Sequence, residues 1–105
     1  MKDLPRVFVD FMNTDGKKHP DGKRRVLLTT TGTREDLASG RIELHEGLRL
    51  MLYSDDADEH GRPDPLIVEG TVRFDSVGQR WVAEVDWDAV RHESDDVSRK
   101  DEDQP

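Results

Sequence analysis

The loop from Asp55 to Asp64 gathers five acidic residues, so it is the first segment to consider for a bound cation. Asp56, Asp58 and Asp64 stand at positions one, three and nine of a calcium-loop pattern, with a glycine at position six. The match then fails, because position five is a histidine and position twelve is Ile67 where a bidentate glutamate is required. A divalent-cation-binding domain is therefore one hypothesis, and a solvated connection between two strands is the simpler one.

The rest of the chain offers little support for catalysis or for a metal site. The four histidines are not spaced three or four residues apart, which would place two metal ligands on one helical face. They are His19, His45, His60 and His92. No glycine-rich phosphate loop, nucleophile elbow or His-Glu-x-x-His segment is present, and the 24 acids are so numerous that carboxylate pairs arise by chance. We predict no catalytic residue, no cofactor and no enzyme activity.

Basic residues crowd one segment near the N-terminus, namely Lys17, Lys18, Lys23, Arg24 and Arg25. Small barrels often bind nucleic acid, so Lys23, Arg24 and Arg25 are candidate phosphate contacts. The chain as a whole is acidic, however, and no aromatic residues alternate with the basic ones, so both charge attraction and base stacking are poorly provided for. A charged hairpin that keeps an edge strand soluble is the simpler interpretation, and a nucleic-acid-associated barrel is the alternative.

Composition limits the class of protein. The chain has 105 residues and a formal net charge of −8, which allows one small acidic domain. It has no cysteine, so disulfides and thiolate zinc sites are excluded and a reducing compartment fits best. No apolar run is long enough for a signal peptide or a membrane span. We therefore expect a cytoplasmic protein without membrane contact.

Apolar and polar residues alternate along most of the chain, and this pattern indicates short β-strands. Val7, Val9 and Phe11 share one face of a first strand, and a second strand runs from Arg25 to Thr31 after a long polar loop. Both strands require an apolar layer beneath one face. The chain is therefore mainly β.

One short helical turn near residues 34–39 interrupts this pattern. Thr33 is its predicted N-cap, with an acid three residues later, and Gly40 is the left-handed residue that ends it. Residues 42–53 then alternate again around a turn at Glu46-Gly47, which predicts a bent central strand.

The clearest pattern is a hairpin formed by residues 66–74 and 80–87, joined by a short connection that contains a glycine. Trp81 and Trp87 fall on the inward face of its second strand, so we expect both to anchor the core. From Arg91 to Pro105 acids dominate and Val97 is the only aliphatic residue, which predicts a disordered acidic tail.

These elements suggest a small closed barrel, since an open sheet of this size would expose an apolar face and two raw edges. The run of strands, the Leu44–Tyr53 pattern, the hairpin around Gly70 and the terminal Asp86–Val90 segment resemble those of small SH3-like barrels. They also resemble small uncharacterised bacterial proteins that share such a barrel. The resemblance spans residues 6–90, implies a barrel of five or six strands, and carries over no functional residue. We therefore expect a barrel domain over residues 1–90 and, from composition, the acidic tail at 91–105.

The remaining function class is a protein-interaction or assembly module. Met51, Tyr53, Ile67 and Val82 fall on the predicted outward faces of the middle and last strands, where a contiguous apolar group would bind a partner or a second copy of the chain. Strand addition at an open edge is one route to such binding. Alternatively, Tyr53 and Ile67 cover the short helix. We take a non-enzymatic interaction module as the leading hypothesis.

Overall fold

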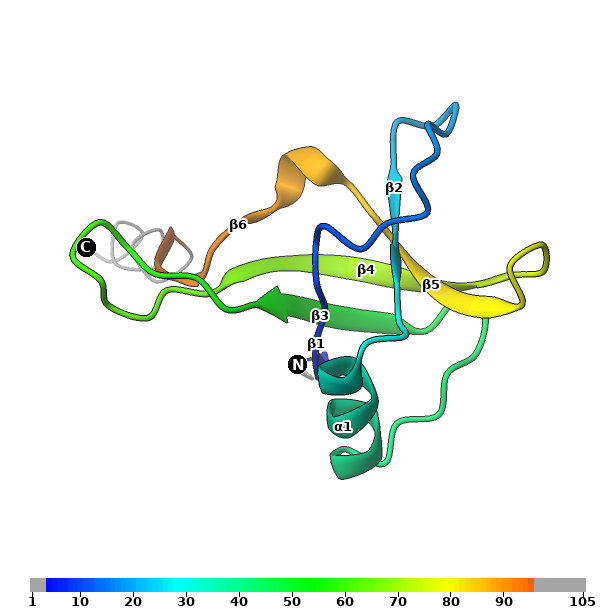
Figure 1. Ribbon diagram of the computed structural model, residues 1–105, viewed down its shortest axis with the longest axis horizontal. Helices are drawn as coiled ribbons and strands as arrows, with labels where there is room; N and C mark the ends of the chain where they lie inside the picture. The colour runs from blue at the N-terminus through cyan, green and yellow to red at the C-terminus, as the bar shows by residue number, and fades with distance from the viewer. Residues whose placement is uncertain (1–3, 96–105) are drawn as a thin grey trace, which may run out of the picture.

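The computed structural model describes residues 4–95 of the chain. Six strands, one α-helix and one 3-10 helix follow one another along it (Figure 1). They are β1 (Arg6–Phe8), β2 (Arg24–Leu27), α1 (Thr31–Ser39), β3 (Arg49–Ser54), β4 (Leu66–Asp75), β5 (Arg80–Val85), η1 (Trp87–Ala89) and β6 (Arg91–His92). The expectation of a mainly β chain is confirmed.

All six strands belong to one sheet, in the order β1-β3-β4-β5-β2, with β6 also paired to β4. β1 runs parallel to β3, and the other pairs are antiparallel. β4 is the central strand: Leu66–Thr71 pair with β3, and Gly70–Asp75 pair with β5. The predicted hairpin is therefore confirmed as β4 and β5, which project together to one side in Figure 1.

The sheet is not closed, so the expected barrel is not confirmed. Strand β1 lies at one end of the sheet and β2 at the other, and the two do not pair with each other. The chain that leaves β1 nevertheless runs to the free side of β2, where Leu27 N–H donates to the Asn13 carbonyl at 2.8 Å. Asp15 N–H donates to the Arg25 carbonyl at 3.1 Å, and Thr14 forms a single bridge with Val26. One continuous segment thus borders both ends of the sheet.

The core is an aliphatic cluster with one aromatic ring, Phe11, and it lies on the face that the alternation predicts. Its buried members are Val7, Val9, Phe11, Val26, Leu28, Leu50, Leu52, Val68, Val72, Ala83 and Val85. Gly70 belongs to the same face because a Cβ there would lie only 2.8 Å from a Leu52 methyl, so glycine is required for β4 to pass. Trp81 and Trp87 are only partly buried against this cluster, so they border the core that they were expected to anchor.

Helix α1 covers the open edge of β1 through hydrogen bonds to one residue. Phe8 N–H donates to the Asp36 carboxylate at 2.8 Å, and the Thr33 hydroxyl donates to the Phe8 carbonyl at 2.5 Å. The same Asp36 oxygen accepts from the Tyr53 hydroxyl at 2.8 Å, and this bond raises the pKa of Tyr53. Both edge-facing groups of Phe8 are therefore satisfied by side chains of the helix, which blocks pairing with another strand at this point.

The helix begins and ends differently from the sequence prediction. It starts at Thr31, with Thr30 as the N-cap that accepts from Thr33 N–H at 3.3 Å. Thr33 was expected at the cap; its side chain is fully buried instead, because its hydroxyl is used on β1. Gly40 is right-handed, with φ −85°, and the left-handed residue is Arg41, with φ 52°. The β2 strand also ends earlier than predicted, at Leu27.

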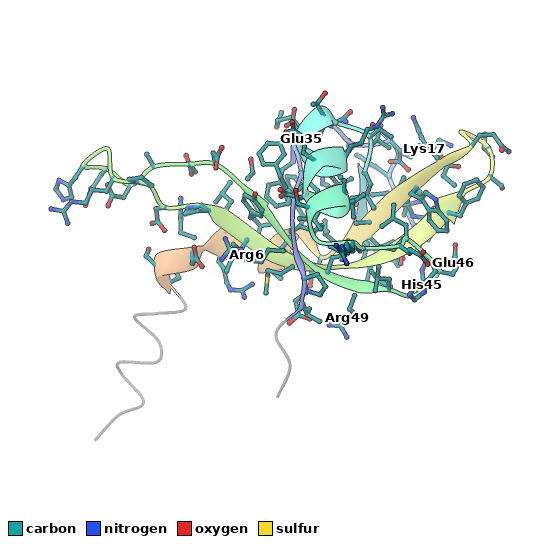
Figure 2. All side chains as sticks on the ribbon, turned by 90° about the horizontal axis from the view of Figure 1, so that it is seen from below. Arg6, Lys17, Glu35, His45, Glu46 and Arg49 are labelled. Atoms are coloured by element: carbon teal, nitrogen blue, oxygen red, sulfur yellow. The ribbon has the colours of Figure 1, made fainter. Side chains whose placement is uncertain are left out.

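The bent central strand is only half present, since regular pairing begins at Arg49. The preceding residues still follow the edge of β4: Gly47 N–H donates to the Val72 carbonyl at 2.9 Å. The Glu46 carboxylate accepts from Phe74 N–H farther along the same edge (Figure 2 labels Glu46). Glu46 thus caps an edge donor of β4 as Asp36 does for β1.

Residues 91–95 differ from the predicted tail because they pack on the body. β6 pairs with β4, Glu93 N–H donates to the Pro65 carbonyl at 2.8 Å, and Arg6 forms an ion pair with Glu93 at 2.7 Å. The Asp64 carboxylate, 8% exposed, accepts from both the N–H and the hydroxyl of Ser94. This contact was missed because the tail was predicted from its lack of apolar residues, whereas residues 91–95 are held by polar contacts. The rest of the predicted tail, 96–105, lies outside the described residues.

We expect Thr33→Val and Asp36→Ala to lower the free energy of unfolding by about 1–3 kcal/mol each, because each leaves a polar group at Phe8 without its partner. Urea unfolding followed by circular dichroism measures the loss. Glu35→Ala is the matched control, since Glu35 is exposed on the same helix (Figure 2). Equal stability of the Asp36 and Glu35 variants would contradict the edge-capping role.

Candidate functional site: a basic pocket beside strand β2

The loop between β1 and β2 is shaped by short-range hydrogen bonds from its own side chains. Gly16 and Gly22 adopt left-handed backbone, with φ 72° and 75°, which glycine accepts without strain. The Thr14 hydroxyl accepts from Gly16 N–H, and the Asp15 and Asp21 carboxylates accept from the N–H groups two residues ahead. The loop therefore has a defined shape, although no strand or helix lies within it.

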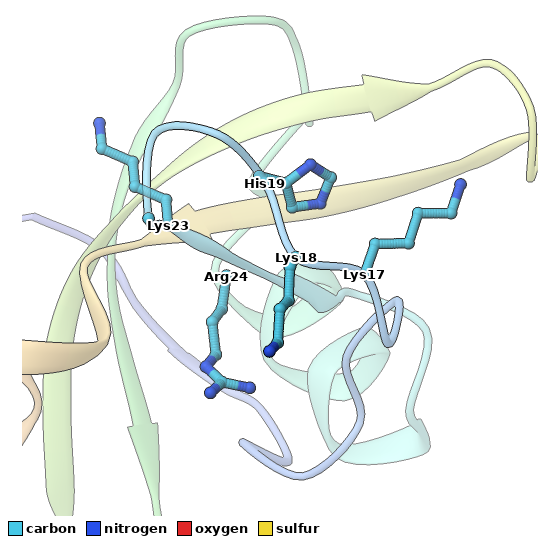
Figure 3. Close-up of a pocket in the computed structure, with 6 residues that line it drawn as sticks. Lys17, Lys18, His19, Lys23 and Arg24 are labelled. Carbon is cyan, nitrogen blue, oxygen red and sulfur yellow. The ribbon is translucent and has the colours of Figure 1, made fainter.

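This loop forms a pocket of about 260 Å³. Its lining residues are Lys17, Lys18, His19, Gly22, Lys23 and Arg24. Figure 3 shows the side chains of Lys18 and Arg24 extending downward, whereas those of Lys17 and Lys23 extend upward and diverge from each other. Four side chains of fixed positive charge thus surround one hollow of an acidic protein.

Ion pairs distinguish several arginines of residues 4–95 from the lysines of the pocket. Five arginines form ion pairs: Arg6 with Glu93, Arg25 with Glu84, Arg49 with Glu69, Arg73 with Glu46 and Glu84, and Arg80 with Asp75. By contrast, Lys17, Lys18 and Lys23 make no ion pair within residues 4–95. These three are also the only lysines in that part of the chain. Their charge is available to a ligand.

Arg24 is held by an aromatic ring. Its guanidinium lies 5.0 Å from the centroid of the Trp87 ring, a cation–π contact. Trp87 in turn meets the buried Phe11 ring edge to face, at 6.0 Å and 83°. The β2 residue is therefore connected through η1 to the core, and its charged group is positioned beside the pocket.

His19 forms the inner wall of the pocket and is anchored by Asp15. The ring Nε2 lies 2.9 Å from the Asp15 carboxylate, and the two side chains are only 13% and 6% exposed. Burial raises the pKa of Asp15, but the hydrogen bonds from Lys17 N–H and His19 outweigh it and leave that pKa below its ordinary value. Asp15 thus stays ionised and fixes the imidazole.

The three predicted nucleic-acid contacts are separated by the structure. Lys23 and Arg24 line the pocket, but the Arg25 guanidinium donates to the Glu84 carboxylate at 3.0 and 3.2 Å across the β2–β5 pair. Arg25 is therefore engaged in the sheet. The pattern of basic residues had pointed to the correct segment, but the support of Arg24 by Trp87 and the anchoring of His19 by Asp15 depend on tertiary contacts that spacing does not reveal.

The acidic loop does not assemble its predicted ligands. Asp56 lies 2.9 Å from His92, the Asp58 carboxylate accepts from two N–H groups of its own loop, and Asp64 is turned to Ser94. Nowhere in residues 4–95 do three or more histidine, aspartate or glutamate side chains gather closely enough to hold a metal ion. The structure gives the cation hypothesis no support.

Two of the four apolar residues predicted to bind a partner are buried. Ile67 and Val82 are 4% and 1% exposed, so the outward orientation deduced from alternation does not leave them accessible. Tyr53 is half-buried: its ring centroid lies 5.8 Å from that of Phe8 and 5.1 Å from the guanidinium carbon of Arg6. Its hydroxyl donates to Asp36, which confirms the alternative prediction that Tyr53 contacts the helix. Met51 is half-buried on the same strand.

The large apolar side chains that are exposed lie elsewhere. Among the described residues they are Met12, Phe74 and Val77. Phe74 packs edge to face on Trp81 at 5.0 Å, near the end of the β4–β5 hairpin. No contiguous apolar patch forms from the four predicted residues.

Comparisons with protein-family models, with curated proteins and with solved structures gave no match. None of the helices in the described part of the chain has the length and apolar character needed to cross a membrane.

We expect the His92 ring to titrate above 6.5, because the hydrogen bond with Asp56 raises its pKa. A raised pKa means that the protonated ring stabilises the fold below pH 6.5 and that this effect is lost as the pH rises through the His92 pKa of the folded protein. The effect is also lost at acid pH once Asp56, whose pKa the same hydrogen bond lowers, becomes protonated. NMR titration of the His92 ring measures it. Asp56→Asn should lower the value, and the exposed neighbour variant Asp55→Asn should not. An unchanged value in Asp56→Asn would contradict the pairing.

Proposed function

We propose that this chain is a non-enzymatic binding module that captures an acidic segment of a protein partner at the basic pocket. The single observation behind the proposal is the charge of that pocket: Lys17, Lys18 and Lys23 form no ion pair with the described residues, 4–95, in a chain of net charge −8. A local positive site in an acidic molecule attracts a local negative group and repels acidic surfaces that approach elsewhere.

The edges of the sheet are poorly suited to strand addition, because several of their hydrogen-bonding groups are already used. The outward N–H and carbonyl of Phe8 are bonded to α1, and Phe74 N–H is bonded to Glu46. β2 is covered by the Asn13–Asp15 segment. Because the strand edges at these points are bonded within the chain, side-chain capture at the pocket is the more accessible mode of binding.

Nucleic acid fits the pocket less well than an acidic protein segment. A nucleic-acid groove carries positive charge along a track and presents aromatic faces for bases. Here the charge comes from one loop, and the nearby Trp87 ring carries the Arg24 guanidinium on its face. A short acidic segment requires neither a track nor a free ring.

The small-barrel resemblance belongs to the same proposal. We propose that the sheet behaves in solution as a small barrel, with the 9–15 segment spanning the gap between β1 and β2. Supporting this are the backbone bonds of Asn13 and Asp15 to β2, together with the position of Val9 N–H, which donates to the Tyr53 carbonyl at 2.9 Å.

The pocket hypothesis is tested by binding of a fluorescent glutamate-rich peptide at low salt, followed by anisotropy. We expect salt-sensitive binding, and we expect Lys17→Gln, Lys18→Gln and Lys23→Gln together to weaken it by roughly tenfold or more. The matched control replaces three exposed arginines outside the pocket, Arg34, Arg41 and Arg62, with glutamine. It removes the same charge.

Three results would count against the proposal. The first is no binding by the native chain. The second is equal loss in the control variant, which would assign the effect to net charge alone. The third is tighter, lysine-dependent binding of a single-stranded oligonucleotide, which would put nucleic acid in place of the protein segment.

A further inference from the structure

Arg24 and Lys18 differ in geometry from the other two cations of the pocket. Their side chains extend in the same direction in Figure 3, whereas Lys17 and Lys23 extend away from each other. All four line the same hollow. A compact anion can therefore meet the guanidinium and one ammonium group together, while the other two lysines contribute charge from the rim.

The support of Arg24 makes it more than a surface charge. The guanidinium carbon lies 5.0 Å from the centroid of the Trp87 ring, and the guanidinium forms no hydrogen bond or ion pair with residues 4–95, so its N–H groups can donate to a ligand. Trp87 is itself held by Phe11, which is 6% exposed. The fork of donors is thus positioned before a ligand arrives, which reduces the ordering cost of binding.

We propose that the pocket recognises a phosphate group on a phosphorylated side chain of the partner protein, with Arg24 and Lys18 as its direct ligands. This rests on the proposed function and names the chemistry of the acidic group. The flat fork of Arg24 donates two parallel bonds to two phosphate oxygens, and Lys18 neutralises the remaining charge.

Charge separates phosphate from carboxylate at such a site. A phosphorylated side chain carries about −1.5 to −2 at pH 7 and has three acceptor oxygens, whereas a carboxylate carries a single charge on two. A carboxylate can satisfy the Arg24 fork but leaves Lys18 without a partner. A phosphate group matches both cations, so the difference in affinity arises from Lys18 and Arg24 together.

The exposure of the pocket favours a phosphate carried on a peptide chain over a phosphate on a free small molecule. Lys17, Lys18, Lys23 and Arg24 are all exposed, and the lining comes from one projecting loop with its adjoining strand residue. Small-molecule sites bury most of their ligand, which this hollow does not allow. A phosphate carried on a peptide chain requires only that its head group enter, while the chain crosses the rim.

The test compares one fluorescent peptide carrying phosphoserine with the same peptide carrying aspartate at that position. We expect the phosphopeptide to bind roughly tenfold tighter at pH 7. Arg24→Lys keeps the charge but loses the fork, so it should abolish most of this preference. Trp87→Leu should do the same without changing any charge, and Trp87→Phe should restore part of it, since the aromatic face returns.

Rim variants provide the matched control. Lys17→Gln and Lys23→Gln should weaken both peptides and lower their ratio only slightly, because a rim charge acts from a distance on either anion. Lys18→Gln should reduce the ratio. Thermal unfolding of each variant shows whether the fold is retained, and a preference that persists in a folded Arg24→Lys variant would overturn the assignment.

The outcomes separate this inference from the function beneath it. Equal binding of the two peptides overturns phosphate recognition and leaves capture of an acidic segment in place. Binding of neither peptide contradicts both. Inorganic phosphate is added as a competitor. If it binds as tightly as the phosphopeptide, the peptide chain contributes nothing to affinity, and the proposal that the phosphate is carried on a protein is overturned.

Discussion

The structure depends on the way side chains close the edge of β1. A short parallel strand at the end of a sheet leaves its outer N–H and carbonyl groups open, and these invite pairing with another chain. Thr33 and Asp36 close this edge at Phe8, so α1 is fixed to the sheet by hydrogen bonds as well as by Leu37, which packs on the core. The Tyr53 hydroxyl joins the same carboxylate and ties in β3. One helical turn thereby determines where the sheet ends.

The distribution of charge follows from that architecture. The strands are rich in arginine, and several of these arginines form ion pairs with acids of a neighbouring strand, as Arg25 does with Glu84. Such exposed or half-exposed pairs add little stability but neutralise each other. The lysines of the described residues are gathered in one loop, and none of them forms an ion pair with an acid of residues 4–95. Together with Arg24 they place unpaired positive charge around one pocket.

Local patterns predicted much of the fold. Alternation located the inward faces of β1 and of the β4–β5 hairpin, because side chains in a strand change sides at every residue. The prediction that Ile67 and Val82 are exposed was wrong. Alternation shows that they lie on the face opposite the core, but it does not show which other segments cover that face. It also missed the end of the domain: Glu93 and Ser94 are held by polar contacts to Arg6 and Asp64, and composition alone reads such residues as solvated. The basic segment was visible in the sequence, but the Trp87 contact that positions Arg24 joins residues 63 apart in the chain.

The central claim is that an acidic protein presents one positive pocket to an anionic partner, and residue-level NMR tests it most directly. Amide shifts of the isotopically labelled chain are followed while the phosphoserine peptide is added. We expect saturable changes confined to residues 16–24 and to Trp87, with little effect on the acidic loop at 55–64. Changes that centre on the β4–β5 hairpin around Phe74 and Val77, with the basic loop unmoved, would contradict it.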